Sequence, residues 1–311
     1  MDAKKPLLLP YLALASAVLL WGLSFVATKI ALAGLPPLCI LFLRFALASL
    51  FFLAWFGRRG LPRLSRADLL RVARIAAFMP VAYFILETYG IKFTTASKAS
   101  LLAATIPLVV LLVSAWGRRE RPRPRVLAGA ALSLPGVGLL VAGGGDAGLL
   151  SGPQLGDLYM SGAVLAAAAY MILAGRLGPG VSCVDLTGLQ MIAGALVFAP
   201  FFLAGMGDVA WADAGRPLAA TLALALGPTI AGFLSYNYAL SRIPAPRASL
   251  GINLVPVVTA AGAWALLGER LAPLQMAGGL LVLLAVALAT APDRRLRAPA
   301  ARAAEPAGAR P

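Results

Sequence analysis

Three charged side chains fall inside long apolar stretches of this 311-residue chain, where an unpaired charge is costly. They are Lys29, Arg44 and Glu87, and each lies roughly 5–9 Å from the nearer end of its stretch, at 1.5 Å of rise per residue. Lysine and arginine side chains can reach that far toward a polar boundary, which is a structural explanation. Mutual neutralisation is an alternative explanation. In a third, a cation binds a substrate carboxylate while Glu87 binds an ammonium group or carries a proton.

Polar and aromatic side chains also recur at helical spacing within the apolar stretches. Tyr83 precedes Glu87 by four residues, which places both on one helix face, and a later stretch carries Tyr236 and Asn237 at equivalent positions. The other candidate substrate-binding residues lie in four further stretches: Trp21, Ser100, Tyr170, Ser249 and Asn253. A cavity lined by these polar and aromatic side chains would suit an amino acid or an aromatic metabolite. The serines can equally serve only to let helices pack closely.

Two prolines, Pro107 and Pro256, occupy matched mid-helix positions 149 residues apart. A proline removes one backbone hydrogen bond and kinks a helix, so both are hinge candidates, the alternative being a helix shaped only for packing. Glu269 precedes Pro273, and we expect its carboxylate to stabilise the positive end of the helix that begins there.

Composition indicates a membrane protein. Hydrophobic residues make up 60% of the chain and charged residues 13%, with a mean hydropathy of +0.87, whereas soluble domains carry about 25% charged residues. The net charge of +15 comes from short basic clusters without interleaved aromatics, which argues against nucleic acid as a partner. Two cysteines and no histidine exclude the familiar zinc and Cys–His motifs, and we expect neither a metal nor a cofactor.

A bilayer core of about 30 Å requires roughly 20 apolar residues per helix. This window predicts ten transmembrane helices joined by short connections, with no room for a separate soluble domain. The expected spans are 10–33, 38–56, 67–90, 97–116, 124–143, 155–174, 184–204, 216–240, 245–266 and 273–291.

The basic residues indicate the orientation of these spans. With the N-terminus in the cytoplasm, 21 of the 27 Lys and Arg residues fall on the cytoplasmic side and only Lys92, Lys98, Arg216 and Arg270 on the other. The prediction is a multi-pass protein of the cell inner (cytoplasmic) membrane with both termini cytoplasmic. Residues 1–9 form a short N-terminal segment, and 292–311 a disordered Ala/Pro/Arg-rich tail.

An internal repeat determines the predicted architecture. The stretch KASLLAATIPL at 98–108 matches RASLGINLVPV at 247–257 with an offset of 149, and further upstream the offset is 146. Helices of 10–143 and 155–291 are therefore two copies of one five-helix unit. Because five is odd, the copies insert in opposite senses, giving an all-α integral membrane fold with two inverted repeats. Such a chain favours alternating access to the two sides.

Several motifs together resemble the drug/metabolite transporter (DMT) superfamily, and most of all its EamA-type ten-helix family. They are WGLSFVATKIAL (21–32), LRFALASL (43–50), the two ASL…P segments and the GER-L-P…G pattern (268–279). The resemblance covers about 10–291 and implies efflux of amino acids or related metabolites through a cavity lined by helices 1, 3, 4, 6, 8 and 9. The second copy departs from the pattern by carrying Ala167 and Ala168 in place of WG.

A secondary transporter that exports small metabolites, most of all amino acids that are aromatic or otherwise apolar, is thus the leading hypothesis. A nucleotide-sugar antiporter of the same superfamily is the alternative, but it would require a more basic cavity than Lys29 and Arg44 supply. A membrane-embedded enzyme would need several Asp or His residues in one loop, and no loop has them. The expected partners are the lipid bilayer and a small-molecule substrate, with the chain a monomer or weak homodimer.

Overall fold

The computed structural model describes residues 8–62, 64–117, 122–142, 152–174, 181–240, 242 and 251–290. All regular elements within these ranges are helical. Their bounds are α1 Leu8–Ala31, α2 Pro37–Arg59, α3 Arg66–Ala76, η1 Ala77–Ala82, α4 Tyr83–Phe93, α5 Ala96–Ala103, α6 Ile106–Gly117, α7 Pro124–Ala142, α8 Gly152–Ala174, α9 Cys183–Gly205, η2 Met206–Asp208, η3 Trp211–Asp213, α10 Gly215–Leu224, η4 Ala225–Gly232, α11 Phe233–Leu240, α13 Val255–Leu267 and α14 Pro273–Thr290.

The prediction of a helical membrane-spanning chain is confirmed. Eight described segments are long and apolar enough to cross a membrane, and the shorter apolar helices Pro124–Leu140 and Val255–Leu267 fall where the fifth and ninth spans are expected. Large apolar side chains such as Leu165, Leu196 and Trp116 are exposed on the helices, as a surface surrounded by lipid requires. The predicted tail, and residues 243–250 of the ninth span, lie outside the described residues.

The third and eighth spans, predicted as continuous helices, are instead interrupted at matched places. In the third, the π-helical segment η1 separates α3 from α4 around Pro80, and Met79 has non-helical dihedral angles of φ −143° and ψ 116°. In the eighth, η4 separates α10 from α11 around Pro228. A proline inside a helix lacks an N–H donor, and its ring displaces the carbonyl of the preceding turn, which explains both interruptions.

The fourth and ninth spans also break at matched places. The helix pauses at residues 104–105 between α5 and α6, and at residues 253–254 before α13. Pro107 and Pro256 are therefore each in the first turn of a new helix rather than in mid-helix, which corrects the sequence-based placement. Proline is tolerated in a first turn because the N–H it lacks would have no intrahelical acceptor there.

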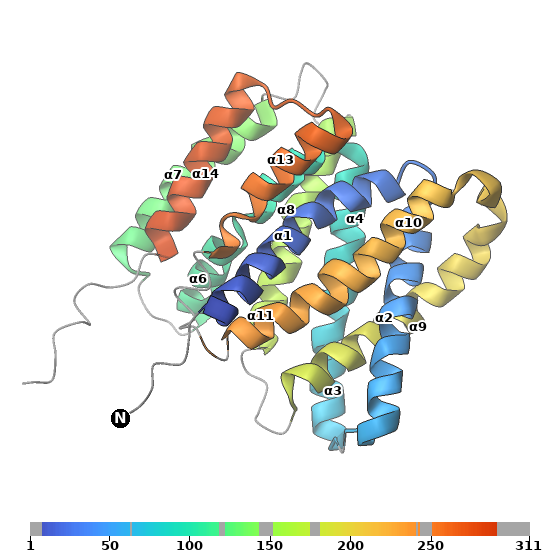
Figure 1. The fold of residues 1–311 in the computed structure, drawn as a ribbon. Coiled ribbons are helices and arrows are strands. Elements are labelled where there is room, and N and C mark those ends of the chain that lie inside the picture. The colour runs from blue at the N-terminus through green and yellow to red at the C-terminus, as the bar shows by residue number, and fades with distance from the viewer. Residues whose placement is uncertain are drawn as a thin grey trace, which may run out of the picture.

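The packing of the helices has the two-fold pattern that two inverted copies require. The pairs α2–α9 and α7–α14 join equivalent helices and lie on opposite flanks of the molecule (Figure 1). Between them α4 packs on α8 as its counterpart α11 packs on α1, and α6 packs on α8 as α13 packs on α1. Exchanging the two repeats exchanges these contacts, so the duplication detected in the sequence is also a duplication of the tertiary arrangement.

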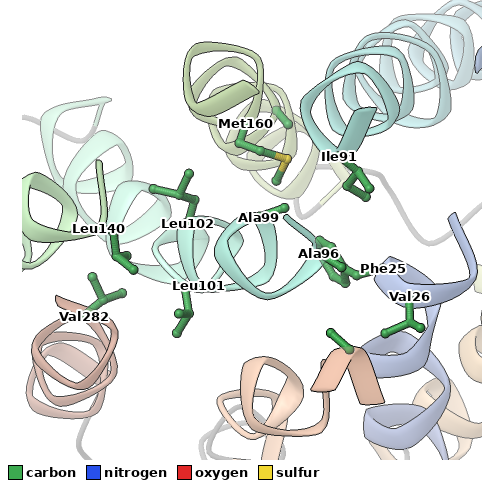
Figure 2. Packing of buried hydrophobic residues seen from close by; sticks show 12 residues of the cluster. Phe25, Val26, Ile91, Ala96, Ala99, Leu101, Leu102, Leu140, Met160 and Val282 are labelled. Carbon is green, nitrogen blue, oxygen red and sulfur yellow. The ribbon is translucent and has the colours of Figure 1, made fainter. Parts of the chain in front are cut away.

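The largest buried cluster surrounds α5. Ala96, Ala99 and Leu102 of this helix pack against side chains from α1, α4, α7, α8 and α14 (Figure 2). Packing is tight where α8 passes the end of α4, because a Cβ atom on Gly156 would lie 2.8 Å from the backbone nitrogen of Thr94. The short α4–α5 turn is consequently enclosed by several helices.

Glu269 has a different role from the predicted one. Its carboxylate accepts hydrogen bonds from the backbone nitrogens of Ala96 and Ser97 at 3.0 and 3.1 Å, and from Ser97 Oγ at 2.9 Å. It therefore caps the N-terminus of α5, while the start of α14 uses the Gln275 side chain, which accepts from Ala272 N. The α13–α14 connection passes over α5, a long-range contact that local spacing does not reveal.

Candidate functional site

Polar side chains converge on the two interrupted helices from the neighbouring span α2. Arg44 is 4% exposed, and its Nε donates a 2.6 Å hydrogen bond to Thr229 Oγ1 within η4. Its guanidinium group lies over the Phe84 ring, 4.4 Å from the centroid, a favourable cation–π arrangement. The side chain thus binds the second repeat and rests on the first, and it does not extend toward a helix end.

Glu87 is the buried acid that faces this cation. Its carboxylate accepts a 2.7 Å hydrogen bond from the Tyr83 hydroxyl, and it interacts electrostatically with Arg44. Across the described part of the chain, neither residue has an oppositely charged atom within 4.0 Å. The two charges therefore attract each other without contact, and each keeps part of its hydrogen-bonding capacity. We call Arg44, Tyr83, Glu87 and Thr229 the polar cluster.

The residue of α9 that matches Arg44 makes the reciprocal contact, from the second repeat to the first. Gln190 aligns with Arg44 at the offset of 146 and donates from its amide to the Met79 carbonyl in η1. A backbone carbonyl left without its helical donor is a strong acceptor that requires a partner when buried. Each interruption is accordingly stabilised by a side chain from the other repeat.

An aromatic wall adjoins the polar cluster. Trp21 Nε1 donates a 3.1 Å hydrogen bond to the Pro228 carbonyl, one residue from the threonine that holds Arg44. The Trp21 ring lies 5.0 Å from that of Tyr236 and 5.5 Å from that of Phe233, between centroids. Gly232 makes this approach possible, since a Cβ atom there would lie 2.9 Å from Trp21 Nε1. We call Trp21, Phe233 and Tyr236 the aromatic cluster.

Lys29, the third predicted charge, lies elsewhere. Its ammonium group donates to the carbonyls of Ile91 at 2.7 Å and Thr94 at 2.5 Å, at the end of α4. A cation at a helix C-terminus is favourable because unpaired carbonyls and the helix dipole meet there. Of the three embedded charges, Arg44 and Glu87 thus lie where they can attract each other, while Lys29 binds backbone carbonyls at a helix end.

The remaining predicted residues either have other described surroundings or lie outside the described residues. Ser100 is buried and donates to the Ser97 carbonyl of its own helix, as expected of a packing serine. Tyr170 packs against Val72 and Leu186, and Asn253 sits at the break before α13. Ser249 and the side chain of Asn237 lie outside the described residues.

Sequence reasoning missed one buried ion pair, between Lys98 Nζ and Asp157 Oδ2 at 2.6 Å. Each residue lies within three positions of the start of an expected span, where a charge can reach a polar boundary and needs no buried partner. The predicted topology could have indicated this pair, because the fourth and sixth spans begin on the same side of the membrane and their first turns can meet. Gln190 was also missed, since a single amide in an apolar span resembles many packing residues.

Comparisons with known proteins agree with this architecture. The model of the EamA-like transporter family matches residues 8–142 and 154–291. An uncharacterised transporter from Archaeoglobus fulgidus is 31% identical over 90% of this chain and 97% of its own. A probable terminal-alkyne amino-acid exporter of Streptantibioticus cattleyicolor is 29% identical, covering 89% and 91%. A probable amino-acid metabolite efflux pump of Salmonella typhimurium is 29% identical, covering 86% and 89%.

The fold also occurs among solved structures, of which we describe one. It superposes with a TM-score of 0.64 over 93% of this chain and 98% of its own, at 22% sequence identity. At that identity the likeness concerns the fold alone.

Proposed function

The chain belongs to the EamA-like transporter family, and from that premise we propose that it exports amino acids or closely related zwitterionic metabolites across the cytoplasmic membrane by alternating access. Two relatives that cover nearly the whole chain carry names of this kind, a probable terminal-alkyne amino-acid exporter and a probable amino-acid metabolite efflux pump. As a transporter the protein acts on a small molecule within a membrane and is not an enzyme.

The proposal of a zwitterionic substrate depends on one observation. Arg44 and Glu87 are buried, opposite in charge and attracted to each other without forming an ion pair. A zwitterion placed between them satisfies both, with its carboxylate on the guanidinium group and its ammonium on the Glu87 carboxylate. Charge-assisted hydrogen bonds of this kind are about twice as strong as neutral ones. The aromatic cluster next to them suits an apolar side chain.

The breaks in the fourth and ninth spans suggest where the helices bend during alternating access. Pro107 and Pro256 begin new helices directly after the pauses at 104–105 and 253–254. At these pauses the regular pattern of helical hydrogen bonding is interrupted, so the flanking helices can change their angle there. We infer that these pairs act as hinges, one in each repeat, with repeat boundaries at 10–143 and 155–291. The two segments matched by the family model support those boundaries.

A counterflow screen tests the proposal. Purified protein in liposomes loaded with an unlabelled amino acid should accumulate the same labelled amino acid, because exchange through one site needs no driving gradient. Parallel arms use nucleobases and nucleotide sugars, with protein-free liposomes as the control. Exchange of nucleotide sugars without amino acids would replace this proposal with the antiporter alternative. The distribution of basic residues supports cytoplasmic termini and the inner membrane, and labelling of a terminal tag in intact and opened cells checks this.

A further inference from the structure

Three polar ties fasten the short turn between α4 and α5. Lys29 of α1 holds the carbonyls of Ile91 and Thr94. Glu269 of the α13–α14 connection caps the N-terminus of α5, and the Lys98 ammonium of α5 pairs with Asp157 of α8. Two of the three ties, those of Glu269 and Asp157, join the first repeat to the second. The turn is therefore a point at which the two repeats are held together at one end of the molecule.

The Lys98–Asp157 pair is the most strongly buried of these ties. Lys98 is 1% exposed and Asp157 is 5% exposed, and their charged atoms are 2.6 Å apart. In such a place an ion pair strongly resists separation, because breaking it leaves two charges without solvent or partner. The pair joins α5 to α8, so the two helices cannot move apart at this end until it breaks.

The opposite end of the molecule lacks the residues for two of these ties. At the offset of 146, Lys29 is matched by Gly175 and Asp157 by Tyr11. At the offset of 149, Lys98 is matched by Arg247, a second cation that would face a tyrosine instead of an acid. Only Glu269 has a matching residue of its own kind, Glu120. Two of the three ties therefore have no counterpart of the same residue types in the other repeat.

This asymmetry has an energetic consequence. Two inverted copies allow two conformations of similar energy that open to opposite sides. A tie present at only one end lowers the energy of the conformation that is closed at that end and shifts the population toward it. A surface pocket of about 520 Å³, lined among others by Lys29, Thr95 and Glu269, lies beside the fastened turn.

We propose that Lys98 and Asp157 form a charged latch that keeps the α4–α5 end closed in the resting transporter and must break in each transport cycle. The latch sets which of the two conformations the unloaded protein prefers. It acts on the motion and not on substrate recognition. The proposal therefore rests on transport itself and is independent of the choice of amino acids as substrate.

A cysteine reporter tests the latch without any substrate. In a background of Cys39→Ala and Cys183→Ser, Ala99→Cys places a thiol on α5 next to Lys98. Ala99 is buried and faces α8 near Met160 (Figure 2). The double variant Lys98→Ala/Asp157→Ala removes both charges together, so no orphan charge is left buried, and its small side chains put no new apolar contact in place of the pair. We expect this change to raise the rate of maleimide labelling in liposomes at least about tenfold, a population shift of about 1.4 kcal/mol.

Three controls separate a latch from a general structural role. The exchanged pair Lys98→Asp/Asp157→Lys should restore slow labelling, because attraction is restored with its sign reversed. Asp68→Asn breaks the exposed Arg71–Asp68 pair within α3 and should change nothing. A reporter at Ala48→Cys, buried in α2, should stay unlabelled throughout. Unchanged labelling at position 99 would overturn the proposal, as would an equal rise at position 48, which indicates loosening of the whole protein.

A second measurement applies even if the apolar double variant does not assemble. Lys98→Cys/Asp157→Cys can be bridged with a short bifunctional methanethiosulfonate reagent and released again with a reducing agent. Bridging should abolish counterflow of whichever solute the wild-type protein exchanges, and reduction should restore it. If the bridged protein exchanges solute at the unbridged rate, the latch does not open during transport and the proposal fails. Failure of the amino-acid screen alone would leave this readout intact.

Discussion

The two interrupted helices show how far the two repeats have diverged while keeping the same backbone. Both η1 and η4 surround a proline, and each receives a polar side chain from the opposite repeat, Gln190 or Arg44. The side chains around them differ at nearly every matched position. At the offset of 149, Tyr83 corresponds to Gly232 and Glu87 to Tyr236.

This difference indicates a division of labour between the repeats. The first interruption adjoins Tyr83 and Glu87, while the second carries Thr229 and adjoins Gly232 and Tyr236, which make room for and contact Trp21. Trp21 itself corresponds to Ala167 at the offset of 146. The two repeats thus supply two equivalent helix interruptions. Different residues at matched positions place charged and polar side chains beside η1 and aromatic side chains beside η4. A substrate with a zwitterionic end and an apolar end fits such a pair.

The largest loss of transport is expected when Arg44 of α2 is replaced by the residue found at the matching position of the second repeat. Arg44→Gln gives position 44 the residue of its counterpart Gln190 and leaves Glu87 buried without its nearest cation. A buried carboxylate that loses its compensating charge is costly, so we expect a clear loss of thermal stability in detergent. Counterflow should fall about 100-fold. Full counterflow activity in this variant would remove Arg44 from the site.

A double variant sharpens that result. Arg44→Gln/Glu87→Gln contains no uncompensated buried charge, so most of the thermal stability should return. Counterflow should remain low, because neither charge is present to bind a zwitterion. Recovery of both properties together would mean that the two residues serve folding only.

Glu87→Gln alone should have the next largest effect. The amide oxygen can still accept from the Tyr83 hydroxyl, and Arg44 keeps its hydrogen bond to Thr229 and its place over the Phe84 ring, so the loss of stability should be smaller than for Arg44→Gln. The negative charge facing the substrate ammonium is lost. We expect about a tenfold loss of amino-acid counterflow, equivalent to 1.4 kcal/mol. Exchange of the corresponding hydroxy acid, which has no ammonium group, should change little. Equal losses for both solutes would contradict the assigned role, and Tyr83→Phe serves as the milder control.

Removal of an aromatic side chain should be less severe. Tyr236→Ala takes away one ring of the aromatic cluster, and such ring pairs contribute about 0.5–1.5 kcal/mol beyond the burial of their area. Counterflow of aromatic amino acids should weaken about fivefold, with membrane insertion unchanged. The same comparison applies to Tyr83→Ala in the polar cluster. Uptake at the wild-type level in both variants would exclude these tyrosines from the site.

The smallest effect separates packing from site geometry. Gly232→Ala places a Cβ atom 2.9 Å from Trp21 Nε1, so the indole must shift by a few tenths of an ångström. We expect a two- to threefold loss of counterflow. Gly57→Ala is the matched control, because a Cβ atom there meets nothing within 4 Å. That variant should keep full activity and gain about 0.5–1 kcal/mol of stability from a lower chain entropy. The comparison fails if the two alanine variants behave alike.

Much of the fold follows from local features of the sequence. Runs of about twenty apolar residues predict the spans, and the two offsets of 149 and 146 predict the duplication, since membrane crossing and repetition are properties of consecutive residues. Interruptions were harder to place. The prediction put bends at Pro107 and Pro256, where the structure has first turns, and it did not foresee the breaks at Pro80 and Pro228. A proline only shows that one backbone hydrogen bond is missing, whereas the response of the helix depends on which side chains reach the freed carbonyl.

The candidate site divides in the same way. Tyr83 and Glu87 could be paired from the sequence because four residues separate them on one helix face. The partners of Arg44 and Lys98 could not, because Thr229 and Asp157 are brought to them from other helices, over 185 and 59 residues of chain. The sequence by itself determined that the chain lies in a lipid bilayer, how many times it crosses, and that it consists of two repeats. All three depend on short-range hydrophobicity and repetition. The tertiary structure alone decided which buried charges attract across the site and which are locked in a pair, since those outcomes depend on how whole helices pack.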